Sequence, residues 1–93
     1  MNVKLVKLTT GEEFVADVQE GENCTSCKNM SKLYVTRDGG GFVPFNPMLP
    51  DDALIVFDNK HIIFVSDVKS DFENAYKETY GKIVTPSNKL IIG

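Results

Sequence analysis

Residues 3–18 read VKLVKLTTGEEFVADV, and this stretch indicates the fold class most directly. An apolar-rich segment over residues 2–8 leads into a turn at Gly11, where glycine supplies a positive φ at little cost. After the turn, apolar side chains occupy alternate positions: Phe14, Ala16 and Val18. Alternation with a period of two, which only Val15 breaks, is typical of a half-buried antiparallel strand. The stretch therefore predicts two antiparallel strands joined by a tight turn.

Further strands are predicted along the first two-thirds of the chain. They are expected over residues 24–37, 53–57 and 61–66, separated by turns at 21–23, 38–41 and 58–60. The strand over 24–37 is long and expected to bend. Nearby prolines restrict residues 42–45 to an edge strand or an ordered loop, because proline cannot donate to a sheet ladder. Short strands linked by short turns predict a small open barrel.

A single helix is predicted over residues 70–80. Ser70 and Glu73 have the spacing of a capping box, and Gly81 is expected to end the helix. Its apolar side chains recur at helical spacing: Phe72, Ala75, Tyr76 and Tyr80. We interpret this stripe as the buried face of the helix, the alternative being a platform on which bases of a single strand stack. The tail over 82–93 ends in Leu90-Ile91-Ile92, expected either to pack on the barrel or to pair with a neighbouring subunit.

Composition narrows the class of protein. The 93 residues are 42% hydrophobic and 25% charged, which indicates a single globular domain rather than a disordered chain. No apolar run approaches the roughly 20 residues that span a bilayer, and the N-terminus lacks an apolar signal segment, so a cytoplasmic location is expected. The net charge of -3 does not indicate a nucleic-acid binder, although a local basic ring is compatible with it.

Two local patterns resemble the Sm-like family, the small bent barrels that assemble into RNA-binding rings. One is the strand-turn-strand unit over 3–18, although the family often has Gly where Ala16 stands. The other is LIVFDNKHIIFV over 54–65, in which a tight loop joins two strands. The resemblance covers residues 2–66 and implies a mainly β, five-stranded, SH3-like open barrel. The helix and the tail would extend the same domain, whereas the family commonly begins with a helix.

Residues 59–61 form the loop that, by the resemblance, would contact RNA. Eukaryotic and archaeal members usually have an Arg-Gly there, whereas Asn59-Lys60-His61 is similar to the Lys-His pair of the bacterial Hfq branch. The chain looks most like the Sm-like proteins of cyanophage and marine phage genomes, which would place it in an infected bacterial host. The resemblance implies a homo-oligomeric ring, from pentamer to heptamer, that binds short U-rich single-stranded RNA near its pore. Lys60 would meet phosphate and His61 a base; the alternative is an ordinary polar turn.

Lys28 and Asn29 are a second candidate for contact with RNA. The family often places an Asn beside an apolar residue, here Met30, in the loop between its second and third strands. An Asn amide has both donor and acceptor atoms, so it can read the edge of a base. On this resemblance Lys28 and Asn29 join Asn59, Lys60 and His61 as the expected RNA-binding set. A simple polar turn is the interpretation that the residues alone favour.

Cys24 and Cys27 form a CxxC motif. The chain has only 2 Cys and 1 His, fewer ligands than a structural zinc site uses. Residues three apart in a strand also point to opposite faces. We therefore expect ordinary reduced thiols and no cofactor, with a zinc ion shared between subunits as the alternative.

The sequence carries no pattern typical of an enzyme. Residues 39–41 are three glycines without the Lys-Ser or Lys-Thr and the helix that follow in a phosphate loop, and no GxSxG motif appears. The adjacent carboxylates at 12–13 and 51–52 are expected to be solvated. We expect neither a small-molecule substrate nor a membrane partner. A rival hypothesis keeps the barrel and the ring but gives it a protein partner, bound through residues 42–49 or 90–92.

Overall fold

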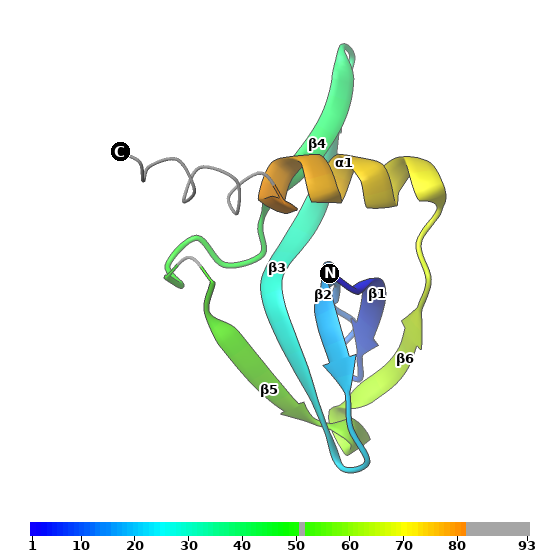
Figure 1. Cartoon of the computed structure of the whole chain (residues 1–93), viewed down its shortest axis with the longest axis vertical. Coiled ribbons are helices and arrows are strands. Elements are labelled where there is room, and N and C mark those ends of the chain that lie inside the picture. The colour runs from blue at the N-terminus through cyan, green and yellow to red at the C-terminus, as the bar shows by residue number, and fades with distance from the viewer. Residues whose placement is uncertain (51, 82–93) are drawn as a thin grey trace, which may run out of the picture.

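The computed structural model describes residues 1–50 and 52–81. Its strands are β1 (Val3–Leu8), β2 (Glu13–Glu20), β3 (Cys24–Thr36), β4 (Gly39–Pro44), β5 (Leu54–Asp58) and β6 (Ile62–Ser66). A 3-10 helix, η1 (Asn59–His61), joins β5 to β6, and helix α1 (Ser70–Tyr80) follows β6 (Figure 1). The predicted class is confirmed: a mainly β, small open sheet with one C-terminal helix. The expectation for Leu90-Ile91-Ile92 lies outside the described residues.

All strands belong to one antiparallel sheet in the order β4-β3-β2-β1-β6, and β5 also pairs with β3. β3 therefore has two partners along one edge, with residues 24–28 beside β5 and residues 31–36 beside β4. In the described part of the chain β5 and β6 are not paired with each other. The sheet is consequently open, and Figure 1 shows β5 and β6 spreading apart from η1 on either side of it.

β3 changes partners at a bulge centred on Asn29, which has a left-handed φ of 53°. Val15 of β2 pairs with Ser31 while Asp17 pairs with Lys28, so β3 holds one extra residue at this point. An extra residue bends its strand and lacks a ladder partner, and Asn adopts left-handed backbone more readily than most residues. The predicted bend of this strand is thus confirmed.

The inner face of the sheet encloses a core around Phe14. The ring of Phe14 lies 5.4 Å from that of Phe45 and 5.8 Å from that of Phe57, measured between centroids. The buried members of this core are Val6, Leu8, Phe14, Ala16, Val18 and Cys27. The alternation predicted for β2 is therefore confirmed.

Helix α1 covers the opposite face of the sheet and forms a second core there. Val15, the exception to the alternation of β2, is buried on this face with Val3 and Phe42 against Tyr76. The rings of Phe42 and Tyr76 meet edge to face with centroids 5.6 Å apart. The interpretation of the helix stripe as a core face is confirmed for Tyr76, which is fully buried, whereas Phe72 is 40% exposed.

Two tyrosine hydroxyls attach α1 to the bulge in β3. The hydroxyl of Tyr76 donates to the carbonyl of Asn29 at 2.8 Å and lies 3.3 Å from that of Lys28. The hydroxyls of Tyr80 and Ser31 are hydrogen-bonded to each other. Burial raises the pKa of the Tyr76 phenol, so this hydroxyl remains a donor. The helix is therefore fixed to the irregular point of the strand by hydrogen bonds as well as by packing.

Helix α1 has the predicted bounds and ends before Gly81 as expected, but the conformations of its two caps differ from the prediction. The capping box is wrong because the N-cap is Lys69, whose carbonyl accepts from the backbone N–H of Glu73. Ser70 is already the first helical residue, and an N-cap side chain must precede the helix. Gly81 follows α1 with a right-handed φ of -68°, so it does not adopt the left-handed turn that glycine often provides there.

The glycine run also differs from the prediction of a break. Gly39, Gly40 and Gly41 all belong to β4, and the turn before them is made by Arg37 and Asp38. The ring of Tyr34 lies over Gly41, where an added Cβ would approach its hydroxyl oxygen to 3.1 Å. The aromatic ring occupies the space that a side chain would fill, which allows glycine within an edge strand.

Replacing Tyr76 by Phe is expected to lower the free energy of unfolding by about 1–3 kcal/mol, because bulge carbonyls lose a buried donor while the ring remains. Urea denaturation followed by circular dichroism measures this change. Tyr34→Phe is the matched control, since Tyr34 is 46% exposed, and it is expected to stay within about 0.5 kcal/mol. Equal effects of the two substitutions would contradict the attachment of α1 through the Tyr76 hydroxyl.

Candidate nucleic-acid interface

The turn over residues 21–23 and helix η1 meet at one end of the sheet (Figure 1), which we call the turn end. Asn59 joins the two segments. Its backbone N–H donates to the carbonyl of Asn23 at 2.9 Å. Its side-chain amide donates to the carbonyls of Gly21 and Glu22 at 2.9 and 3.2 Å. Its Oδ1 accepts from the buried hydroxyl of Thr25 at 2.6 Å, so both ends of the amide are occupied within the chain.

Lys60 and His61 are presented on the exposed side of the turn end. Asp58 is the N-cap of η1 and accepts from the backbone N–H of Lys60 at 3.0 Å, which fixes the start of the short helix. The salt bridges found among residues 1–50 and 52–81 involve other lysines: Lys4, Lys7 and Lys77. The ammonium of Lys60 and the imidazole of His61 are therefore accessible to a ligand, one as a cation and the other as a flat ring.

The structure does not bring Lys28 and Asn29 to the turn end. The loop between β2 and β3 is residues 21–23, whereas both of these residues lie inside β3. Lys28 pairs with Leu54 at the opposite end of β5 from η1. Their predicted placement in a loop or turn is wrong because Asn29 forms the bulge of a continuous strand. The expected RNA-binding set is thus split, with Asn59, Lys60 and His61 together and the other two elsewhere.

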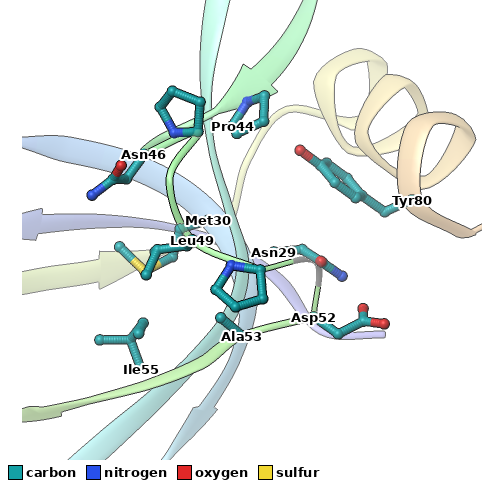
Figure 2. Close-up of a pocket in the computed structure, with 11 residues that line it drawn as sticks. Asn29, Met30, Pro44, Asn46, Leu49, Asp52, Ala53, Ile55 and Tyr80 are labelled. Atoms are coloured by element: carbon teal, nitrogen blue, oxygen red, sulfur yellow. The ribbon is translucent and has the colours of Figure 1, made fainter.

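Asn29 instead lines a pocket of about 120 Å³ between β3, residues 46–50 and 52–53, and α1 (Figure 2). The lining is apolar at Met30, Leu49, Ala53, Ile55 and three prolines, and polar at Asn29, Asn46, Asp52 and Tyr80. Sequence reasoning missed Asp52 because adjacent carboxylates on a turn are usually solvated. Nothing in the sequence indicates that Asp52 and Asn29 lie close together, because their proximity depends on the path of the chain after β4.

Acidic groups accompany the cations of the turn end. Glu22 lies in the turn and Asp58 caps η1, while Lys60 is the only lysine or arginine that the turn and η1 contribute. A single copy of the turn end is therefore not strongly basic. Attraction of a polyanion would require several copies of Lys60 close together.

The outer strands leave two edges open beside the turn end. β5 pairs only with β3 and β6 only with β1 among the described strands. Both carry exposed large apolar side chains: Leu54 and Val56 on β5, and Ile63 and Phe64 on β6. Unpaired edges with exposed apolar groups are typical of strands that pair with another chain.

The cysteines of the CxxC motif have different surroundings. Cys24 is exposed and Cys27 is fully buried in the inner core, on the opposite face of β3. Burial raises the pKa of the Cys27 thiol to about 11. Within residues 1–50 and 52–81, no cluster of three or more His, Cys, Asp or Glu side chains could hold a metal ion.

The chain matches no protein-family model, and no curated protein matches it. Helices long and apolar enough to cross a lipid bilayer are absent from the described residues.

Replacing Asn59 by Ala is expected to lower the free energy of unfolding by about 1–3 kcal/mol, because the buried Thr25 hydroxyl and the turn carbonyls lose their partner. Lys60→Ala on the same short helix is the control, expected within about 0.5 kcal/mol because its side chain is exposed. Urea titration of both variants measures the difference. A loss at Asn59 no larger than that at Lys60 would show that the amide does not hold the turn end.

Thiol modification is expected to separate the two cysteines. A disulfide reagent at pH 8 should modify Cys24 of the folded protein quickly and Cys27 slowly, because the thiolate is the reactive form and Cys27 is both protonated and buried. In a Cys24→Ser variant the remaining reaction should accelerate by about tenfold per pH unit below the raised pKa of Cys27. Equal rates at pH 8 in the folded protein would contradict the burial of Cys27.

Proposed function

We propose that this chain is an Sm-like protein that assembles into a homo-oligomeric ring and binds short single-stranded, U-rich RNA. One observation carries the proposal: exposed Lys60 and His61 sit on a short helix that Asn59 ties to the neighbouring turn, between two unpaired strand edges. The role is binding rather than catalysis. The proposal places the ring in the cytoplasm, of an infected bacterium if a phage encodes the chain.

The ring would form by strand pairing between copies. The free edge of β5 on one copy and that of β6 on the next offer unpaired backbone groups and exposed apolar side chains. Contact between two different edges is head-to-tail, so each added copy leaves the same pair of edges open until the rotation closes a ring. Closure between pentamer and heptamer would bury Leu54, Val56 and Phe64 at every interface.

Ring formation would convert a weakly charged turn end into an RNA site. Because η1 joins the two strands that make the contact, every subunit would contribute one Lys60 and one His61 to the same rim. Each Lys60 ammonium would meet a phosphate, and each His61 ring would stack on or hydrogen-bond to a base. Asn59 would have a different part from the RNA contact expected of it: because its amide is already occupied within the chain, it would position the other two.

A ring that binds a protein is the second candidate. The carboxylates of Glu22 and Asp58 beside the cations favour it, as does the net charge of -3. The hairpin of β3 and β4 also exposes apolar side chains that the RNA proposal does not use: Leu33, Val35 and Val43. This candidate keeps the assembly and removes the contact with phosphate.

RNA binding is tested by fluorescence anisotropy of labelled oligo-U and oligo-A at low and moderate salt, at protein concentrations where the ring is assembled. We expect oligo-U to bind more tightly, with an affinity that falls as salt rises because phosphate contacts release counterions. Lys60→Ala combined with His61→Ala should abolish this binding. Lys69→Ala is the control, because Lys69 is also an exposed lysine and lies in the connection to α1.

Light scattering on a sizing column tests the assembly separately. Val56→Lys places a charge beside the open edge of β5 and is expected to reduce the ring to smaller species. Val35→Lys makes the same change at an exposed valine on the hairpin and should leave the mass unchanged. An intact ring that binds neither oligonucleotide would favour the protein-binding candidate, and a monomer at all concentrations would overturn both.

A further inference from the structure

The pocket beside the bulge of β3 holds polar groups that neither the fold nor the turn end uses (Figure 2). Asn29 and Asp52 are the non-glycine residues with positive φ in the described chain, at 53° and 64°, and both line this pocket. Left-handed backbone at non-glycine residues often occurs where a ligand is held. The bulge accounts for the conformation of Asn29. That of Asp52 belongs to a turn closed by the hydrogen bond from the backbone N–H of Ala53 to the carbonyl of Pro50, so local backbone geometry presents both side chains at the pocket.

Some of the polar groups at the pocket already make hydrogen bonds within the chain, and others do not. The backbone carbonyl of Asn29 accepts from Tyr76, but in the described residues its side-chain amide has no partner. The exposed carboxylate of Asp52 likewise makes no hydrogen bond or ion pair there. Figure 2 shows both side chains directed toward the side of the pocket on which Tyr80 lies. By contrast, Oδ1 of Asn46 accepts from the backbone N–H of Met48 at 3.0 Å.

The remainder of the pocket suits a flat and largely apolar body. Met30, Leu49 and Ile55 supply aliphatic surface, and the rings of Pro44 and Pro50 add rigid apolar walls. In a mostly apolar pocket, a small number of polar groups fixes the orientation of the ligand and determines which ligand binds. The small volume, about 120 Å³, restricts the buried part of the ligand to a single small ring system.

We propose that this pocket binds a guanine base. The carboxylate of Asp52 can only accept hydrogen bonds, and the amide of Asn29 offers donors beside it. Among the RNA bases, guanine alone places two N–H donors, N1 and N2, next to each other with the O6 acceptor alongside. Asp52 then accepts from N1–H and N2–H while Nδ2 of Asn29 donates to O6.

The other bases fit this pair of side chains less well. Uracil has a carbonyl on each side of its N–H, and the oxygens of these carbonyls would repel the carboxylate oxygens of Asp52. Adenine and cytosine each present one amino group beside an unprotonated ring nitrogen, which leaves part of the carboxylate without a donor. A bound base would cover the carboxylate, and a polar group that is covered without a partner costs more than a lost apolar contact, so the pocket is expected to select guanine.

The guanine can come from an RNA strand or from a free guanosine nucleotide. In the first case the inference rests on the proposed RNA-binding function, to which it adds preference for one base. In the second case it is independent of that function. Lys60 and His61 lie at the turn end and outside the pocket, so substitutions there and at Asp52 affect the two proposals separately.

Calorimetry with GMP, IMP, AMP and UMP tests free nucleotides, and anisotropy with oligo-U against oligo-U carrying one central G tests the strand. We expect guanine to bind about 5- to 150-fold more tightly than the other bases in at least one arm, the range of a good bidentate pair. IMP lacks the N2 amino group and should lose most of the advantage of GMP. Preference in the nucleotide arm identifies a free ligand, and preference in the strand arm alone identifies RNA.

Asp52→Asn is expected to remove the preference for guanine, because an amide cannot accept from both N–H groups. Asn tolerates the left-handed backbone of this position, so the variant should stay folded, which circular dichroism checks. Asp38→Asn in the hairpin turn is the matched control and should retain the preference. Absence of guanine preference in both arms, or a preference that persists in folded Asp52→Asn, would overturn the proposal. Loss of oligo-U binding in the Lys60 and His61 variant with guanine preference retained would support both proposals.

Discussion

The left-handed bulge at Asn29 is the constraint on which the rest of the structure depends. It lets β3 run beside β5 in its first half and beside β4 in its second, and it redirects the strand between them. The carbonyl at the bulge needs a donor from outside the ladder, which the hydroxyl of Tyr76 supplies. The position of α1 and the burial of the second core both follow from that bond and from the packing around it.

At the other end of the sheet a single amide has a comparable role. Asn59 satisfies carbonyls of the turn and a buried hydroxyl at once, so η1 and the turn are held as a unit. That leaves Lys60 and His61 as the groups available to a ligand. An RNA site built from so few groups gains strength only through repetition, since several weak contacts on one assembly act at high effective concentration.

In our proposals the turn end and the pocket contribute different parts of recognition. Charge at Lys60 meets any phosphate, so the preference of the turn end for U-rich RNA rests on the His61 rings. The pocket has an acceptor-only carboxylate beside an amide donor, so it reads the pattern of donors and acceptors on one base. The two lie at different places along β3, with the turn end at its start and the pocket beside its bulge.

Local patterns predicted most of the strands and the extent of α1, because alternation and helical spacing report directly on burial. They failed at caps, turns and bulges, where the same residue types suit more than one backbone conformation. The predicted capping box at Ser70 does not form, because the extended Lys69 is the N-cap of α1. Gly39–Gly41 belong to a strand and not to a turn, and the ring of Tyr34 covers Gly41. The assignment of Lys28 and Asn29 to a loop failed because a bulge and a turn use the same polar residues.

The amino-acid sequence alone determined the fold class, the inner core of β2 and the exposure of the Lys60-His61 pair, since each depends on neighbours within a few residues. Only the tertiary structure decided that Val15 lies under α1, that the amide of Asn59 is already occupied and that Asn29 and Asp52 share a pocket. These facts depend on contacts between segments far apart in the chain. Periodicity and spacing carry no information about such contacts, because they describe one segment at a time.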